Sequence, residues 1–286
     1  MVKIDFLVPG FSKCGTMTVC ALLAQHPGIY IPELKEPWYF SSNDFPRRQA
    51  DYIQHFSPAL EGQLLGEGSV SYSGHEQEDV SISRINDNNP ACRFIFIARN
   101  PLRRIESSYR EMHHSGVKFG LNAPYGLADN LEVFPEMIKD SCFFERISKY
   151  VNAFGEPAIL VLFLEDLTRE PQREMEKCFR HLGVDPGFQI DPKLRLNKGS
   201  SKLYDTRILR YLRSKPWSGF KLARFSPEAQ DSFLKPLGLR RTFSTPVEWD
   251  ARSLAVVRAK VWPDAQRFLR AYGKEPDFWR IQGGAE

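Results

Sequence analysis

Hydrophobic residues along this chain form short continuous runs that alternate with stretches of helical spacing. The continuous runs predict buried strands at Lys3 to Pro9, Phe94 to Ala98 and Ala158 to Leu164. Apolar residues at helical intervals predict helices over Thr16 to His26, Leu102 to Ser115 and Pro171 to Leu182. A short run at residues 29–31 predicts one more strand. This alternation predicts an α/β fold in three layers, with a central parallel sheet flanked by helices.

In a parallel sheet of this kind, ligands bind beyond the carboxyl ends of the strands. The loops that follow Pro9, Ala98 and Leu164 should therefore lie along one edge of the sheet. The segment from Ala223 to Val247 has no clear period and predicts no particular element. The chain has 286 residues and no internal repeat, so we interpret residues 1–286 as a single domain.

Composition and charge narrow the classes of function. The chain is 42% hydrophobic and 26% charged, which is typical of a globular protein with a substantial core. Its net charge of +4 suits an anionic ligand, and the absence of a basic and aromatic stripe disfavours a nucleic-acid partner. The sequence shows neither a signal peptide nor an apolar run long enough to cross a membrane. The five cysteines form no CxxC pair, so we expect a cytoplasmic protein without a metal site.

The most informative stretch is the loop at residues 10–18, between the first strand and the first helix. A glycine-bearing loop at this position directs backbone N–H groups towards the helix N-terminus, where the helix dipole favours an anion. Lys13 adds a full positive charge, and Thr16 and Thr18 add hydroxyl groups. A plain helix cap by Thr16 is the alternative. Gly10 and Gly15 have the spacing of a nucleotide P-loop, but Thr16-Met17 replaces its Lys-Ser/Thr pair, which disfavours a kinase or ATPase.

A second candidate site follows the strand that ends at Ala98. Arg99 leaves that strand with a planar set of donors suited to phosphate oxygens. Ser107 lies in the next predicted helix, where its hydroxyl could reach the same phosphate. The alternative is that Arg99 pairs with a carboxylate such as Glu67.

These two stretches resemble the sulfotransferase family. Residues 12–16 resemble the P-K-S-G-T loop that holds the 5′-phosphosulfate of 3′-phosphoadenosine 5′-phosphosulfate (PAPS), and Arg99 with Ser107 is similar to the family's 3′-phosphate motif. The resemblance implies a P-loop-like sulfotransferase fold with PAPS as donor co-substrate. It implies a donor site formed by Ser12, Lys13, Cys14, Gly15, Thr16, Met17, Thr18, Arg99 and Ser107. Lys198 and Gly199, in a late loop, are implied as further donor ligands.

Two other stretches resemble the heparan-type and related bacterial branch of the family. Residues 35–40 (KEPWYF) resemble its K-E-x-x-F-F stretch, in which the glutamate is the catalytic base. The resemblance implies Glu36 as general base and Lys13 as the group that stabilises the leaving phosphate during in-line transfer. Residues 66–72 resemble its G-E-K-T/S-P-x-Y segment, but Gly68 and Val70 replace a lysine and a proline. The rival candidates for the base are His75, His113 and His114.

The acceptor is the least determined part of the hypothesis. An aromatic wall could come from the segment Phe119 to Tyr125 and from Trp38, Tyr39, Phe40 and Tyr72, with His113 nearby. We expect a small-molecule acceptor that is sulfated on a hydroxyl or an amine, and we expect neither a nucleic-acid nor a membrane partner. The oligomeric state stays open. The alternatives are a P-loop nucleotide-dependent kinase, which would need magnesium and turn over ATP, and a catalytically inactive nucleotide-binding module.

Overall fold

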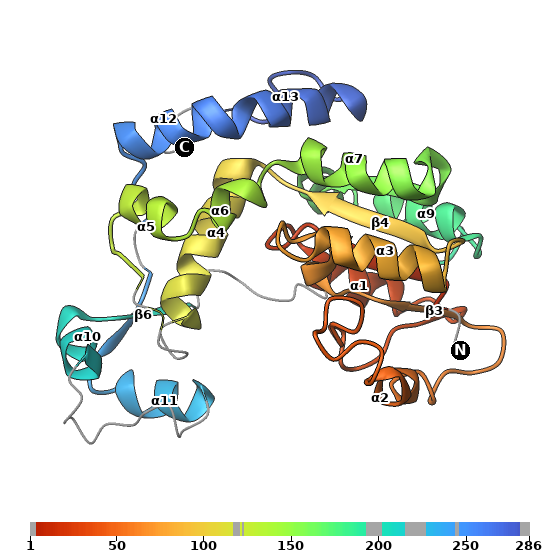
Figure 1. Ribbon diagram of the computed structural model, residues 1–286, viewed down its shortest axis with the longest axis horizontal. Helices are drawn as coiled ribbons and strands as arrows, with labels where there is room; N and C mark the ends of the chain where they lie inside the picture. Colours follow the sequence, from red (N-terminus) through yellow and green to blue (C-terminus); the bar gives the residue numbers. More distant parts are fainter. Residues whose placement is uncertain are drawn as a thin grey trace.

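The computed structural model describes residues 4–116, 121, 123–192, 202–214, 227–243 and 246–280. At its centre lies a sheet of five strands in the order β2-β3-β1-β4-β5 (Figure 1). The strands are β1 (Phe6–Gly10), β2 (Ile29–Tyr30), β3 (Leu64–Glu67), β4 (Arg93–Ala98) and β5 (Ile159–Phe163). Every neighbouring pair is parallel, which confirms the predicted parallel sheet.

Helices cover both faces of this sheet. One face carries α1 (Thr16–Leu23) and α9 (Pro171–Leu182), and the other carries α3 (Glu78–Asn88) and α7 (Phe143–Phe154) (Figure 1). The helix α13 (Trp262–Ala271) packs against α7. The predicted three-layer arrangement is therefore confirmed.

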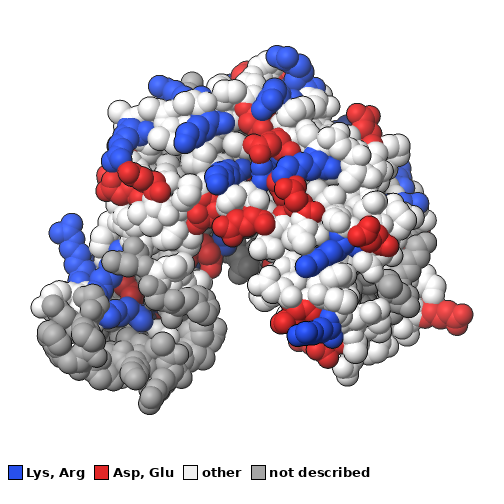
Figure 2. Space-filling view, in the orientation of Figure 1, with Lys and Arg blue, Asp and Glu red and all other residues white. Residues whose placement is uncertain are grey.

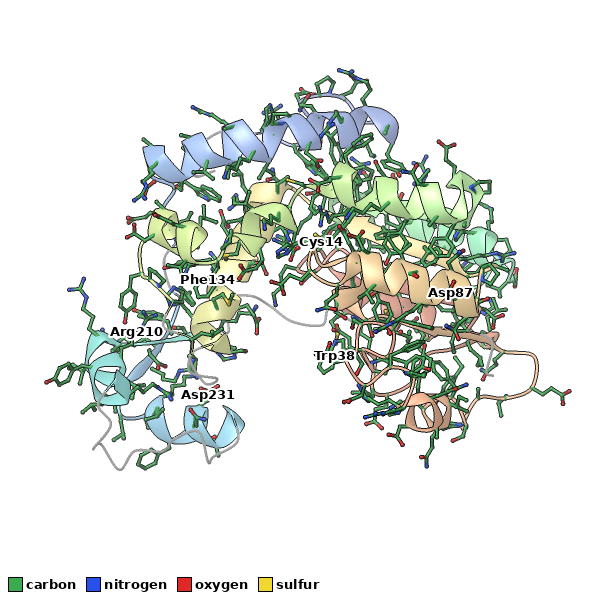
Figure 3. The ribbon with its side chains drawn as sticks, viewed as in Figure 1. Cys14, Trp38, Asp87, Phe134, Arg210 and Asp231 are labelled. Atoms are coloured by element: carbon green, nitrogen blue, oxygen red, sulfur yellow. The ribbon has the colours of Figure 1, made fainter. Side chains whose placement is uncertain are left out.

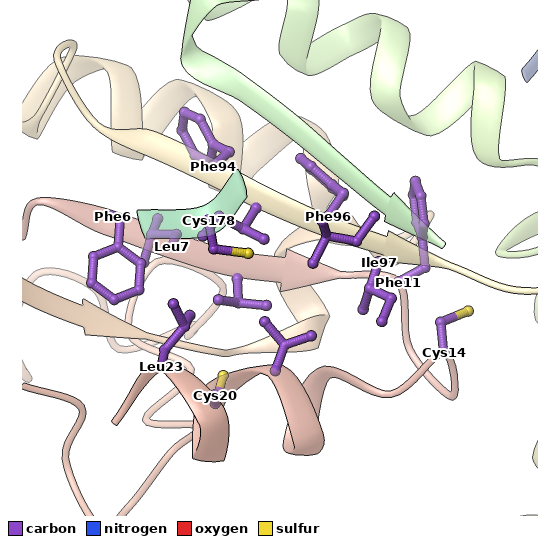
Figure 4. Close-up of a cluster of buried hydrophobic side chains, with 14 of the residues drawn as sticks. Phe6, Leu7, Phe11, Cys14, Cys20, Leu23, Phe94, Phe96, Ile97 and Cys178 are labelled. Atoms are coloured by element: carbon purple, nitrogen blue, oxygen red, sulfur yellow. The ribbon is translucent and has the colours of Figure 1, made fainter. Parts of the chain in front are cut away.

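The hydrophobic core explains the continuous apolar runs in the sequence. Phe6 and Leu7 of β1 and Phe94 and Phe96 of β4 are at most 1% exposed, because helices cover the sheet on both sides. Figure 4 shows these side chains beside Leu23 of α1. Trp279, near the C-terminal end, belongs to the same core. That packing agrees with a single domain, which stays a prediction.

The remaining elements extend the layered core. They are α2 (Gln49–Gln54), η1 (Val70–Ser73), α4 (Pro101–His114), α5 (Leu127–Val133), α6 (Glu136–Lys139), η3 (Glu156–Ala158), α8 (Leu164–Arg169), β6 (Leu203–Asp205), α10 (Arg207–Ser214), α11 (Pro227–Leu234), β7 (Arg240–Thr242) and α12 (Ala251–Lys260). The strands β6 and β7 form a separate antiparallel pair. The helix α4 leads from the sheet towards β6, and an indentation separates the part with α10 and α11 from the part with α1 to α3 (Figures 1 and 2).

The boundaries of the predicted elements hold to within a few residues. The helix α9 begins and ends where the pattern places it, and α4 is displaced by one residue at each end. At Leu164 the structure begins α8, although the apolar pattern continues the strand through that residue. The segment without a clear period contains α11 and β7. In the described ranges no helix has the length and hydrophobicity needed to cross a membrane, and a cytoplasmic location stays a prediction.

Candidate active site

The carboxyl ends of all five strands meet at one edge of the sheet, because the strands are parallel. The loop after β1 carries Lys13, and the turn between β4 and α4 carries Arg99. Gly68 follows β3, and Glu36 lies in the segment after β2. The structure therefore brings to this edge the loops that the sequence analysis assigns to donor binding and to the general base.

The loop after β1 is shaped by two residues with left-handed backbone. Gly15 has φ of 106°, and a Cβ atom there would lie 3.0 Å from Cδ1 of Leu164, so the position favours glycine. Lys13 also has a positive φ, of 66°. Gly15 is the N-cap of α1, and Thr16 lies inside the helix. The alternative in which Thr16 caps the helix is therefore wrong.

The first turn of α1 presents open hydrogen-bond donors. In the described part of the chain, the backbone N–H groups of Gly15, Thr16 and Met17 donate to no protein acceptor. The N–H of Cys14 donates to the carbonyl of Phe11 (3.1 Å), and the Cys14 thiol is fully buried. Burial raises the pKa of that thiol to about 12, so it stays neutral. Figure 4 shows Cys14 in the loop beyond the end of the strand. The loop thus offers an anion three open N–H groups at a helix N-terminus.

Two arginines donate hydrogen bonds to backbone carbonyls of the loop after β1. Nη1 of Arg99 donates to the carbonyl of Lys13 (3.1 Å), and Nε of the buried Arg104 donates to the carbonyl of Ser12 (3.2 Å). Arg104 also forms an ion pair with Asp140 (3.4 Å). Among the described residues Arg99 forms no ion pair, so the alternative in which it pairs with Glu67 is wrong. With respect to the described residues, one nitrogen of Arg99 is engaged, which leaves part of its guanidinium available beside the loop.

The side chain of Lys13 is held by a carboxylate that the sequence analysis does not identify. Its Nζ lies 2.8 Å from Oε2 of Glu111 in α4, and Nζ of Lys202 contacts the same oxygen. Burial alone would raise the pKa of Glu111, but Lys13, Lys202 and the Ser115 hydroxyl together hold it well below its usual range. Burial and the charge of Lys13 lower the pKa of Lys202. The edge thus contains two ammonium groups that share one carboxylate.

The four-residue spacing between Ser107 and Glu111 is a sequence feature that could have indicated Glu111. At that spacing both residues face the same side of α4. Ser107 is half-buried on that side. Lys202 has no comparable signal, because it follows residues without a periodic pattern and reaches the edge only through the antiparallel pair of β6 and β7.

Glu36 is bound through both of its carboxylate oxygens. Oε1 accepts from Nζ of Lys35 (2.8 Å), and Oε2 accepts from Nε1 of Trp38 (3.1 Å). Nζ of Lys35 also donates to Oγ1 of Thr16 in the donor loop (3.2 Å). The structure therefore joins the candidate base to the candidate donor loop through one lysine.

Among the described aromatic residues of the predicted wall, two are exposed, Trp38 and Tyr125 (38% exposed), and three are buried. Trp38 is 52% exposed, has φ of 52°, and faces the indentation (Figure 3). Tyr39 stacks on Tyr52 with ring centroids 4.3 Å apart, and Phe40 packs edge-on against Tyr72. Tyr39, Phe40 and Tyr72 are at most 5% exposed, so they pack in the hydrophobic core and do not line an exposed wall.

The three candidate histidines have structural contacts. His113 is buried, contacts Arg210 and stacks on Tyr125, and burial lowers its pKa to about 4. It lines a cavity of about 340 Å³ to which no donor-loop residue contributes. Nδ1 of His75 lies 3.1 Å from Asp140, and Nδ1 of His114 accepts from the backbone N–H of Leu203.

Some predicted residues cannot be placed. Lys198 and Gly199 lie outside the described residues, as do positions 119, 120 and 122 of the acceptor segment. Thr18 lies in the first turn of α1, and its N–H donates to the carbonyl of Gly15 (3.0 Å). Within the described ranges no group of three His, Cys, Asp or Glu side chains is arranged to hold a metal ion, and metal independence stays a prediction.

Comparisons with known proteins agree with this geometry. A family model described as "Sulfotransferase domain" matches residues 3–205. A curated relative, bifunctional heparan sulfate N-deacetylase/N-sulfotransferase 3 of Mus musculus, is 23% identical over 247 residues, which cover 79% of this chain and 27% of that protein. This chain therefore spans about a quarter of the length of that relative.

Two solved structures share the fold. A sulfotransferase from Alicyclobacillus acidocaldarius superposes with a TM-score of 0.58 at 24% identity, over 69% of this chain and 87% of that chain. The sulfotransferase domain from the curacin biosynthetic pathway superposes with a TM-score of 0.50 at 15% identity, over 91% of this chain and 97% of that chain.

Proposed function

Since the chain belongs to the sulfotransferase family, we propose that it transfers the sulfuryl group of PAPS to a hydroxyl or amine of a small-molecule acceptor. The observation that carries this proposal is the set of open N–H groups of Gly15, Thr16 and Met17 beside the ammonium of Lys13. A helix N-terminus with unengaged donors and a lysine attracts a phosphate or sulfate group.

The residues present suit both ends of the donor. The open amides and Lys13 would hold the 5′-phosphosulfate, and the Thr16 hydroxyl lies in the same turn. Arg99, just before α4, and Ser107, in the middle of that helix, would hold the 3′-phosphate. Lys202 adds a second ammonium beside Lys13, which sequence reasoning does not assign. Four of the five side chains come from segments that follow β1 and β4, neighbouring strands of the sheet.

The proposed transfer step is an in-line displacement at sulfur. An oxygen or nitrogen of the acceptor forms a bond to sulfur, while the bond between sulfur and the bridging phosphate oxygen breaks. Negative charge develops on that leaving oxygen, and Lys13 stabilises it. Glu36 takes the proton from the acceptor. Before the step, Lys13 must exchange the carboxylate of Glu111 for the donor, since both are anions that bind the same ammonium.

Trp38 and the surface charge support a small acceptor. The exposed indole of Trp38 lies beside Glu36, where an apolar or aromatic acceptor could stack while its hydroxyl meets the carboxylate. Figure 2 shows Lys and Arg mixed with Asp and Glu over the visible face, with no continuous basic track for a polyanionic polymer.

Calorimetric titration with 3′-phosphoadenosine 5′-phosphate, in buffer containing a chelator and no metal, tests the donor site. We expect one molecule to bind per chain, and adenosine 5′-phosphate, which lacks the 3′-phosphate, to bind more weakly. Incubation with PAPS and a panel of alcohols, phenols and amines should then yield products that are heavier by one SO₃ group. Failure of the nucleotide to bind, or magnesium-dependent turnover of ATP in its place, would overturn the proposal.

A further inference from the structure

Lys35 occupies a position that the transfer chemistry alone does not explain. Its side chain is only 11% exposed, and its Nζ contacts three acceptors from three separate segments. These acceptors are Oε1 of Glu36 (2.8 Å), Oγ1 of Thr16 (3.2 Å) and the carbonyl of Gly68 (2.7 Å). An ammonium group has three N–H donors and no acceptor, so all three donors of Lys35 are engaged.

The space around Lys35 depends on Gly68. A Cβ atom at position 68 would lie 2.6 Å from Cε of Lys35 and 3.2 Å from its Nζ. The backbone confirms the close approach, since the N–H of Gly68 donates to the carbonyl of Lys35 (2.9 Å). A side chain at position 68 and the present conformation of Lys35 therefore exclude each other.

The three contacts have consequences for both halves of the candidate site. Thr16 accepts a hydrogen bond from Lys35, which leaves the Thr16 hydroxyl hydrogen to donate to an anion at the loop. Glu36 is held on Oε1 by Lys35 and on Oε2 by Trp38, so its carboxylate cannot rotate freely. Lys35 thus fixes a donor-loop hydroxyl and the base relative to each other.

We propose that Lys35 is the positioning residue that aligns the donor loop with the general base, and that Gly68 is the glycine that makes room for it. The inference rests on the proposed function, because it takes Glu36 as the base. Lys35 acts through Thr16 and Glu36 and does not itself contact the reacting atoms.

The first test is K35M, which keeps a long apolar side chain and removes the charge. The matched control is K177M in α9, whose lysine pairs with Glu174 on the same helix. Transfer from PAPS is measured with 4-methylumbelliferone, benzyl alcohol and benzylamine as probe acceptors, and the fastest probe is used for all variants. We expect kcat of K35M to fall by about 10- to 100-fold, as for the loss of a hydrogen bond to a charged group. The dissociation constant for 3′-phosphoadenosine 5′-phosphate should change by less than about threefold, and K177M should match wild type on both measures.

The second test is G68A, which leaves every charge in place. We expect it to lower kcat in the wild-type background, because the methyl group displaces Lys35, and to leave kcat unchanged in the K35M background. Such non-additivity is the signature of two positions that act through one interaction. Thermal unfolding of each variant measures the separate effect of the methyl group on Cys20, whose Sγ would lie 2.7 Å away.

Three outcomes would overturn the inference. They are a kcat of K35M within about twofold of wild type, equal losses of kcat and nucleotide affinity that follow loss of folded protein, and additive effects of K35M and G68A. Wild-type protein that binds the nucleotide but modifies no probe would instead count against the proposed function itself.

Discussion

Replacement of Glu67 by glutamine tests how the end of β3 supports the candidate site. The Glu67 side chain is fully buried beside Tyr52, and its Oε2 accepts from the backbone N–H of Ser69 (2.7 Å). The Ser69 hydroxyl in turn accepts from the N–H of Trp38 (3.0 Å). Glu67 is therefore linked through Ser69 to Trp38, and Trp38 contacts Glu36. Glutamine keeps the shape and an acceptor oxygen but cannot ionise.

The magnitude follows from the pKa of the buried carboxyl. Burial raises the pKa of Glu67 from 4.5 to about 7, against the opposing effect of its hydrogen bonds to Tyr72 and Ser69. Because the pKa is raised in the folded state, the neutral carboxyl stabilises the fold fully below pH 4.5, and this contribution is lost as the pH rises through about 7. At about 1.4 kcal/mol per pKa unit, the total effect is about 3 kcal/mol.

The assay is urea unfolding of wild type and E67Q, followed by tryptophan fluorescence at a series of pH values. Between pH 5 and pH 8 the free energy of unfolding of E67Q should rise relative to wild type by roughly 2 to 3 kcal/mol. E61Q is the matched control, since Glu61 is exposed and close in sequence. A constant difference between E67Q and wild type across this range, or one that shrinks as the pH rises, would refute the reasoning.

Four further predictions concern the candidate site. K13A should lower kcat about 10²- to 10³-fold while nucleotide affinity changes far less, and near-normal turnover would remove Lys13 from the mechanism. E36Q should lower kcat about 10²- to 10⁴-fold, and full activity at every pH tested would reject Glu36 as the base. R99A should weaken calorimetric binding of 3′-phosphoadenosine 5′-phosphate about 10- to 150-fold and affect adenosine 5′-phosphate much less, so equal losses would contradict its role. E111Q should tighten nucleotide binding several-fold, since it removes the carboxylate that competes for Lys13, and weaker binding would contradict that competition.

Much of the sheet is predictable from the sequence because its central strands are buried on both faces. The run at β4 has five consecutive buried residues, and a continuous apolar run of that kind marks a covered parallel strand. The strand β3 gives no such signal. It has four residues, Leu64–Glu67, of which one is glycine and one is a buried carboxylate, so burial of Glu67 breaks the pattern. Its place between β1 and β2 depends on pairing across the sheet, which periodicity does not encode.

The candidate site shows the same division between local and long-range signals. The donor loop is predictable because glycine, lysine and the helix start lie within one continuous stretch of residues. Glu111 and Lys202 come from positions 98 and 189 residues beyond Lys13, and only the packing of α4 against β6 brings them to it. The sequence predicts too large an aromatic wall, because a local signal, the residue type, does not distinguish a binding wall from a core. Tyr39, Phe40 and Tyr72 have the residue type of a binding wall, yet the same residue type fills cores, and the structure uses them there.

The role inferred for Lys35 follows from the position of β3. The segment that carries Glu36 leaves β2, and the donor loop leaves β1, so the end of β3 separates the two. A contact between them must cross that end, and the crossing passes directly over Gly68. In its present conformation Lys35 spans this distance past Gly68, where a Cβ atom would lie 2.6 Å from Cε of Lys35. The conformation of Lys35 therefore depends on the glycine at position 68. Both residues matter because β3 lies between the segment that carries Glu36 and the donor loop.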